Sequence, residues 1–255
     1  TTTIIQSKLH WEDIDANLSM FEAKLDAIEG ETDLVVLPEM FTTGFSMNAA
    51  ALAEPMNGKS IDWMAMNAKK INAVLTGSII IKEDGNYYNR LIWMRPDGSY
   101  LHYDKRHTFT MAGEHQTYQK GTRKLIVELK GWKICPLICY DLRFPAWARN
   151  IEDYDLLIYT ANWPVKRSSH WKILLQARAI ENQCFVAGIN RVGLDGNGHY
   201  YTGDSCIVSP SGEFYFQAAD VEATKNSVLS ANYLRFIRQK LPFLPDRDAI
   251  SVSED

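Results

Sequence analysis

Three residues with complementary chemistry each lie just past the end of a predicted strand: Glu39, Lys105 and Cys139. In α/β proteins, ligands bind in the crevice beyond the strand ends. A thiol needs a base to become a nucleophilic thiolate, and a nearby ammonium group lowers its pKa. A glutamate can accept that proton and return it to a leaving amine. The lysine would then stabilise an oxyanion together with the backbone N–H of Tyr140.

Cys139 follows the predicted buried strand Lys133–Ile138, which leads through a turn into a predicted helix near residues 144–150. Such a strand–turn–helix connection holds a side chain at the end of a sheet where its strands finish, and it directs backbone N–H groups toward a ligand. Taken singly, Cys139 has a plainer interpretation as a small buried apolar residue. Glu39 likewise could be a loop carboxylate, and Lys105 could be a solvated charge. The combination of the three favours nucleophilic catalysis.

Composition bounds the classes of protein to which this chain can belong. Its 255 residues, 46% of them hydrophobic, can bury one large α/β core, and we expect a single domain over residues 1–255. A net charge of −4 without a basic block argues against nucleic acid and anionic membranes as partners. No apolar run reaches membrane-spanning length and no signal peptide opens the chain, so a cytoplasmic location is expected.

Four cysteines are too sparse for a disulfide scaffold and predict reduced thiols. Two of them are spaced C-x₃-C without a second pair, which argues against a zinc site, and we expect no metal. The four are Cys135, Cys139, Cys184 and Cys206.

Hydrophobic periodicity predicts alternating strands and helices with hairpins between them, which indicates mixed sheets covered by helices. The unbroken apolar run 34–37 is typical of a strand covered on both faces. Turns at 84–85 and 96–98 divide residues 74–104 into an antiparallel meander. Residues 106–121 have no clear period and are expected to form a loop along a pocket. Further strands are predicted at 3–9, 124–129, 132–138, 155–160, 184–189, 205–209, 213–217 and 227–229, with helices near 18–28, 60–71, 168–182 and after 231.

Three motifs resemble the nitrilase (carbon–nitrogen hydrolase) superfamily, which carries a Glu-Lys-Cys triad. They are Leu-Pro-Glu-Met-Phe at 37–41, Tyr-Asp-Lys-Arg-His at 103–107 and Ile-Cys-Tyr-Asp-Leu-Arg-Phe-Pro at 138–145. Asn-Trp-Pro at 162–164 and the segment 176–182 also resemble the family, so the likeness spans nearly the whole chain. Gly-Glu-His at 113–115 is similar to the place where the family often has a second glutamate that positions the triad, which implies this role for Glu114.

The resemblance implies a four-layer αββα sandwich that dimerises, with neither a metal nor an organic cofactor. Within the superfamily the motifs look most like those of bacterial ω-amidases. These enzymes hydrolyse the terminal amide of 2-oxoglutaramate or 2-oxosuccinamate to the dicarboxylate and ammonia, here through a thioester on Cys139. Alternatives in the same superfamily are an aliphatic amidase, an N-carbamoyl amidohydrolase and a nitrilase. A more distant alternative is a Cys-His hydrolase with His107, His115, His170 or His199 as base, and a binding module without chemistry is a further one.

An ω-amidase must also bind the carboxylate at the far end of its substrate, which requires a cation or several N–H donors. Arg143, Arg106 and Arg191 are available, although Arg143 could instead be structural, through an ion pair with Asp141 or a neighbour. Apolar walls could come from Phe41, Phe45, Phe109, Met111 and Trp163, each of which could equally be core. The predicted substrate-binding residues are Tyr140, Phe41, Arg143 and Trp163. The tail at about 240–255 is expected either at a dimer interface or folded back on its own chain.

Overall fold

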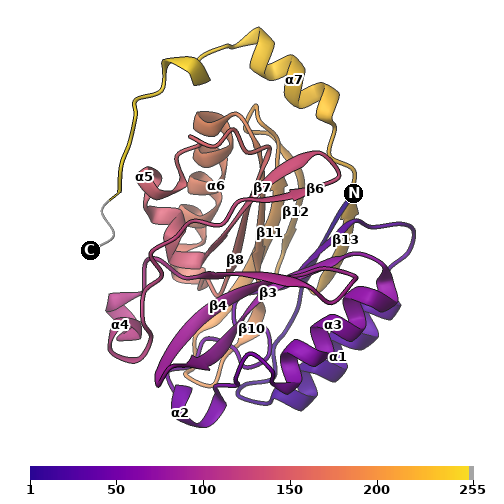
Figure 1. Cartoon of the computed structure of the whole chain (residues 1–255), viewed down its shortest axis with the longest axis vertical. Coiled ribbons are helices and arrows are strands. Elements are labelled where there is room, and N and C mark those ends of the chain that lie inside the picture. Colours follow the sequence, from indigo (N-terminus) through magenta and orange to yellow (C-terminus); the bar gives the residue numbers. More distant parts are fainter. Residues whose placement is uncertain (253–255) are drawn as a thin grey trace.

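The computed structural model describes residues 1–252, and these form two β-sheets packed face to face between outer layers of helices (Figure 1). The first sheet runs in the order β13-β1-β2-β3-β4-β5, with β1, β2 and β3 parallel and the other neighbours antiparallel. Its strands are β13 (Ala223–Ser227), β1 (Thr2–Gln6), β2 (Leu34–Val36), β3 (Val74–Glu83), β4 (Asn86–Met94) and β5 (Tyr100–Asp104).

The second sheet runs in the order β10-β11-β9-β8-β7-β6, and β12 pairs with β11. Strands β7, β8 and β9 are parallel, whereas the other neighbours are antiparallel. Its strands are β10 (Val192–Leu194), β11 (Tyr200–Val208), β9 (Phe185–Asn190), β8 (Leu156–Ala161), β7 (Trp132–Ile138), β6 (Val127–Leu129) and β12 (Phe214–Ala219).

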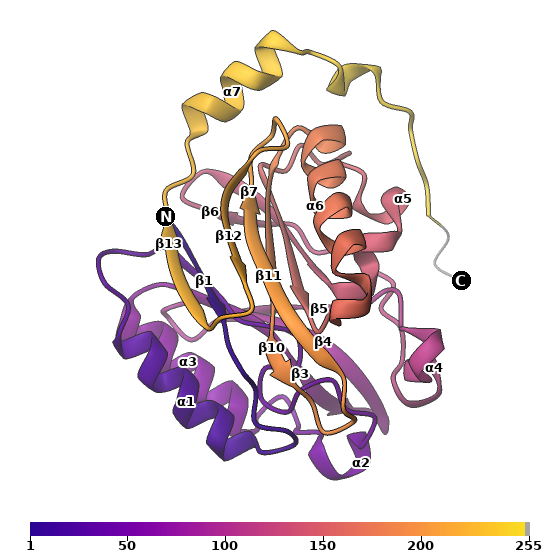
Figure 2. The ribbon, with the colours of Figure 1, turned by 180° about the vertical axis from the view of Figure 1, so that it is seen from behind.

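Helices cover the outer face of each sheet, α1 and α3 on the first and α5 and α6 on the second (Figure 2). The α-helices are α1 (Ile14–Asp26), α2 (Ala49–Leu52), α3 (Lys59–Ile71), α4 (Glu114–Thr117), α5 (Pro145–Ala148), α6 (Ser168–Asn182) and α7 (Ala231–Lys240). Short 3₁₀ turns are η1 (Thr110–Ala112), η2 (Cys139–Arg143), η3 (Val165–Arg167) and η4 (Leu244–Asp246). The predicted αββα layering with mixed sheets is confirmed.

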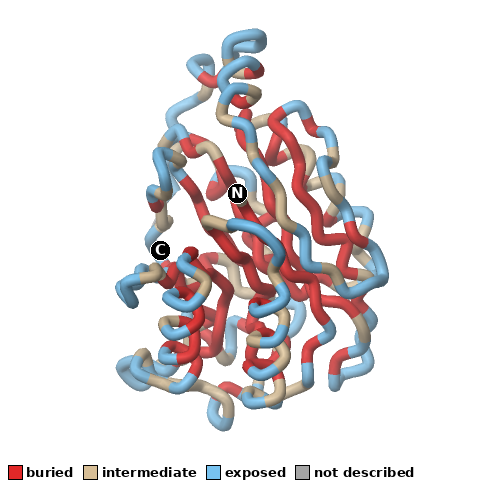
Figure 3. The backbone as a smooth tube through the Cα atoms, turned by 90° about the vertical axis from the view of Figure 1, so that its right-hand side faces the viewer, coloured by how far each residue is buried: buried red, intermediate tan, exposed pale blue. Residues whose placement is uncertain are grey.

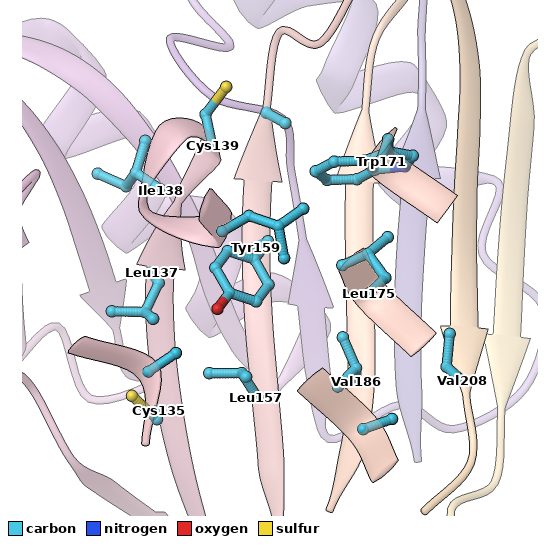
Figure 4. Packing of buried hydrophobic residues seen from close by; sticks show 14 of the residues in the cluster. Cys135, Leu137, Ile138, Cys139, Leu157, Tyr159, Trp171, Leu175, Val186 and Val208 are labelled. Carbon is cyan, nitrogen blue, oxygen red and sulfur yellow. The ribbon is translucent and has the colours of Figure 1, made fainter. Parts of the chain in front are cut away.

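Alternation of side chains along the central strands explains the four layers, because successive residues of a strand point to opposite faces. On β2, Val35 belongs to the buried cluster under the helices with Phe21, whereas Val36 lies between the two sheets with Ile158. On β8, Leu157 points outward into the cluster under α6 (Figure 4). Figure 3 shows the resulting continuous burial along the strands. The unbroken apolar runs are therefore strands covered on both faces.

Several element boundaries differ from those predicted. The edge strand expected at 227–229 is β13, which ends at Ser227 and pairs with β1. Helix α3 begins at Lys59, one residue before the predicted start, and the hydroxyl of Ser60 is hydrogen-bonded to Glu54. The loop expected over 106–121 contains η1 and α4.

The C-terminal segment lies outside the sandwich. Helix α7 lies beyond the ends of the strands, and the chain after it passes on the side of α5 (Figures 1 and 2). Of the predicted tail at 240–255, the last three residues, 253–255, lie outside the described residues. Within residues 1–252, none of the helices combines the length and apolar character needed to cross a membrane.

Candidate active site

The corner after β7 holds Cys139 in an unusual backbone conformation. Cys139 has a φ of +41°, in the left-handed region that residues other than glycine seldom adopt. The carboxylate of Asp141 accepts a hydrogen bond from the backbone N–H of Ile138 at 3.0 Å and so closes the turn. Figure 4 shows the Cys139 sulfur just beyond the end of the strand, as the sequence predicts.

Glu39, Lys105 and Glu114 form one fully buried ion cluster. Lys105 Nζ lies 2.8 Å from Glu39 Oε1 and 2.9 Å from Glu114 Oε2. Asn89, in the middle of β4, donates from Nδ2 to Glu39 at 2.8 Å and to Glu114 at 3.1 Å. The two carboxylates therefore share both a cation and an amide, and together they fix the position of the ammonium group.

Asn162, directly after β8, connects this cluster to the cysteine. Its backbone N–H donates to Glu39 Oε2 at 2.8 Å, and its side-chain amide donates to the Glu39 carbonyl at 2.6 Å. The thiol of Cys139 is 3.9 Å from the Asn162 carbonyl oxygen. The strand ends of the two sheets thus meet here, with Glu39 and Lys105 from the first and Cys139 from the second.

Burial dominates the electrostatics of the site. It lowers the pKa of Lys105, but the charges of Glu114 and Glu39 more than offset that effect, so the pKa lies above its ordinary value. Burial also raises the pKa of Glu114, and Lys105 opposes that shift. For Cys139, burial and the charge of Glu39 raise the thiol pKa well above its usual range, while Lys105 lowers it less. The sequence predicts a thiol whose pKa is lowered by the lysine, but in the structure burial of the thiol, together with the charge of Glu39, outweighs that effect.

Alkylation of Cys139 by iodoacetamide should therefore accelerate with pH. Because its thiol pKa lies well above the usual range, the thiolate fraction and the alkylation rate should rise about tenfold per unit between about pH 7 and 9. Mass spectrometry of the Cys139 peptide over a pH series measures this rate. The buried Cys206 thiol serves as an internal control that stays unmodified. A rate that levels off near neutral pH would contradict the raised pKa.

A cavity of about 400 Å³ opens beside the cysteine and the lysine. Tyr140, Arg143 and Trp163 line it, as the sequence predicts, together with Phe45 and Phe109. Met111 and Asn162 lie along the same cavity.

Phe41 is a correction to the predicted site. Its side chain is fully buried and packs in the core against Phe21 and Trp63, with ring centroids 5.6 Å and 5.8 Å away, outside the lining of the cavity. The side chain sits two residues past Glu39, and the turn there directs it under the helices.

Positive charge gathers on one wall of this cavity. The Arg143 guanidinium lies 4.7 Å from the ring centroid of Trp163, and Arg167 lies 5.3 Å from that of Phe109. Arg143 has a nitrogen 3.3 Å from Nδ1 of His170. Arg143 and Asp141 do not form the ion pair that was the alternative for Arg143.

The other two candidate cations lie outside the lining. Arg106 donates to the Gly121 carbonyl and lies over the Trp147 ring, and Arg191 donates to the Leu194 carbonyl. Sequence reasoning did not single out Arg167 or Asn89. A buried asparagine inside an apolar strand is the one local signal for Asn89, because buried polar side chains need partners.

Comparison with known proteins identifies the family. A model of the carbon–nitrogen hydrolase family matches residues 1–232. The chain belongs to the carbon–nitrogen hydrolase family. This hydrolase is 48% identical over 247 residues to the omega-amidase YafV of Escherichia coli (strain K12), covering 96% of each chain. It is 31% identical over 251 residues to the 2-oxoglutaramate amidase of Bacillus subtilis (strain 168), again covering 96% of each.

The same family relation appears in three dimensions. The hydrolase superimposes with a TM-score of 0.97 on XC1258 from Xanthomonas campestris, a CN-hydrolase superfamily protein with an arsenic adduct in its active site. The two are 41% identical, and the match covers 99% of this chain and 98% of that one. Among the described residues of the hydrolase, no group of three or more His, Cys, Asp and Glu side chains is arranged to hold a metal ion.

Proposed function

We propose that this chain is an ω-amidase that hydrolyses the terminal amide of small 2-oxo acid amides, 2-oxoglutaramate or 2-oxosuccinamate. The products are the dicarboxylate and ammonia. The observation that carries the proposal is a buried lysine held between two carboxylates beside Cys139, at the end of a cavity with a cationic wall. The 48% identity to an omega-amidase over nearly the full chain supports the same activity.

Acylation begins with the thiol protonated, because its pKa is raised. Glu39 accepts the thiol proton as the Cys139 sulfur attacks the amide carbon and forms a carbon–sulfur bond. The carbonyl π electrons move to oxygen, and Lys105 with the Tyr140 N–H stabilises this oxyanion. As the carbon–nitrogen bond breaks, Glu39 gives its proton to the departing ammonia. A thioester on Cys139 remains.

Deacylation reuses the same groups. Glu39 accepts a proton from water, whose oxygen attacks the thioester carbon, and Lys105 again stabilises the oxyanion. The carbon–sulfur bond then breaks, the dicarboxylate leaves, and Glu39 returns the proton to the Cys139 sulfur. Glu114 acts by holding the ammonium of Lys105 in place through its two contacts of 3.0 Å and 2.9 Å.

The cavity suits a short substrate with a charged end. Aromatic side chains of Phe45, Phe109 and Trp163 provide walls for a short carbon chain. Arg143 contributes the charge for the distal carboxylate, with Arg167 nearby, because guanidinium groups match carboxylates in geometry as well as in charge.

Replacing Arg143 by glutamine should raise KM for 2-oxoglutaramate by about 10- to 100-fold, the usual contribution of a hydrogen bond to a charged group. Cleavage of a neutral aliphatic amide by the same variant should change little, because such an amide has no carboxylate to bind. Steady-state kinetics on both substrates measures the difference. Arg123→Gln, at an exposed position away from the cavity, is the matched control. An equal loss on both substrates would assign Arg143 to structure.

Ammonia release from 2-oxoglutaramate and 2-oxosuccinamate tests the proposed activity directly. Glutamine, asparagine, an N-carbamoyl amino acid and a simple nitrile are the comparators, each measured with wild type and Cys139→Ala. Release from the 2-oxo amides alone, lost in the variant, is the expected result. Cys139-dependent turnover of the other compounds instead would place the chain with the aliphatic amidases, N-carbamoyl amidohydrolases or nitrilases.

We also propose that the chain is one cytoplasmic domain that forms a homodimer without a metal or an organic cofactor. Apolar side chains in the C-terminal segment support an interface there, since Phe236 and Leu241 are each about half exposed. Sedimentation velocity at two concentrations tests the dimer, and a monomer at both would refute it.

A further inference from the structure

Asp141 connects the segment that carries the lysine with the corner that carries the cysteine. Its buried carboxylate accepts a hydrogen bond from the Tyr103 hydroxyl at 2.7 Å and from the backbone N–H of Ile138 at 3.0 Å. It also accepts one from the backbone N–H of His107 at 3.0 Å, and Nδ1 of the same ring lies 2.8 Å away. Tyr103 and His107 lie two residues before and after Lys105, so one carboxylate binds the chain on both sides of the lysine.

The His107 ring fills the space between these two segments. It stacks on Phe144 with ring centroids 3.7 Å apart and planes inclined by 7°. Its side chain is 21% exposed, and it does not belong to the lining of the cavity. Because a carboxylate oxygen accepts at this position, Nδ1 carries the hydrogen. His107 therefore contacts Asp141, which connects the two segments of the site, and lies outside the cavity proposed for the substrate.

We propose that His107 is a positioning residue, whose side-chain hydrogen bond to Asp141 holds the Lys105 ammonium in register with the Cys139 sulfur. The reasoning is geometric. Asp141 closes the turn that gives Cys139 its φ of +41°, and the same carboxylate anchors the segment after β5. A shift of either segment would separate the oxyanion donors, and misplacement by about 1 Å costs as much as 100-fold in rate.

The matched pair His107→Asn and His107→Leu tests this role. Asparagine and leucine have nearly the same shape and both lose the stacking on Phe144, but only asparagine can donate to Asp141. We expect kcat of H107L to lie about 10- to 100-fold below that of H107N, with KM values within about twofold of each other. His102→Phe is the control. His102 is an exposed histidine on β5, the strand directly before Lys105, and this variant should retain wild-type kinetics.

The comparison of kcat values rests on the proposed amidase activity, so a second measurement that needs no substrate accompanies it. The iodoacetamide alkylation rate of Cys139 at a fixed alkaline pH should differ between the two variants in the same order as kcat. A wild type that is inactive on 2-oxo amides, but whose variants differ in alkylation, would refute the substrate and leave the positioning role supported.

Three outcomes would overturn the proposal. If H107N and H107L are both active, with equal kcat and equal alkylation rates, the hydrogen-bond donor at position 107 is unimportant. Equal inactivity of both folded variants would favour a histidine acting as base, as in a Cys-His hydrolase. If H107L does not fold, His107→Phe supplies a donor-free side chain that keeps the stacking. Failure of both to fold, with H107N folded, would make the role of His107 structural only.

Discussion

Cys139→Ala should lower kcat for 2-oxoglutaramate by at least about 10⁴-fold, the scale seen when a covalent nucleophile is removed. Without the sulfur no thioester forms, and Glu39 and Lys105 are left to act on water and an unactivated amide. The fold should persist, because the hydrogen bond of the Cys139 thiol to the Asn162 carbonyl is long, 3.9 Å, and alanine fits the same space. Ammonia release and the thermal midpoint, measured on the same preparation, separate these effects.

Cys135→Ala is the matched control, since it removes another buried thiol from β7, the strand that leads into Cys139. That variant should lose some stability through the cavity it creates, while its activity per folded molecule stays close to wild type. Intact-protein mass spectrometry after rapid quenching should detect the acyl adduct in C135A but not in C139A. Activity of C139A within tenfold of wild type would end the thioester mechanism.

Much of the fold was predictable because the central strands have a simple physical signature. The runs at 34–37 and 156–159 are hydrophobic at every position, which is typical of a strand covered on both faces. Turn residues such as Asp84-Gly85 fixed the meander locally. The edge strand β13 was misplaced because its burial is partial and its partner β1 lies at the other end of the chain.

The site was predictable in its residue types but not in its contacts. Each of the three principal residues follows a strand, which the sequence alone indicates. The hydrogen bond from the Asn162 backbone N–H to Glu39 joins the two sheets across 123 residues of sequence, and no local pattern encodes it. Phe41 adjoins a motif, yet only the packing of α1 and α3 decides that its side chain is core. The burial of the thiol and the charge balance around Lys105, which together set the direction of the thiol pKa, likewise depend on tertiary contacts.

Lys105→Met should lower kcat by at least about 100- to 1,000-fold, for a different reason than C139A. Methionine fills the same space but removes the proposed oxyanion donor, and such a donor alone is worth about 100- to 1,000-fold in kcat. It also leaves Glu39 and Glu114 facing each other without the cation that both contact. Removing one member of a buried ion cluster typically costs about 3–5 kcal/mol, so the free energy of unfolding should fall by that amount. Urea denaturation measures it, with the exposed Lys82→Met as control.

The pH dependence of this loss tests the electrostatic explanation. Burial already raises the pKa of Glu114, and Lys105 is the group that opposes the shift, so the variant should raise that pKa further. A carboxyl group whose pKa is raised by folding contributes stability that is fully present below its unfolded-state pKa and is lost as the pH rises through its folded-state pKa. K105M should therefore lose stability from about pH 5 to 8 relative to wild type. Adding Glu114→Gln should restore the stability at pH 8 without restoring turnover, because one carboxylate no longer faces another while the oxyanion donor is still missing. Recovery of turnover in the double variant would mean that Lys105 serves only to neutralise charge.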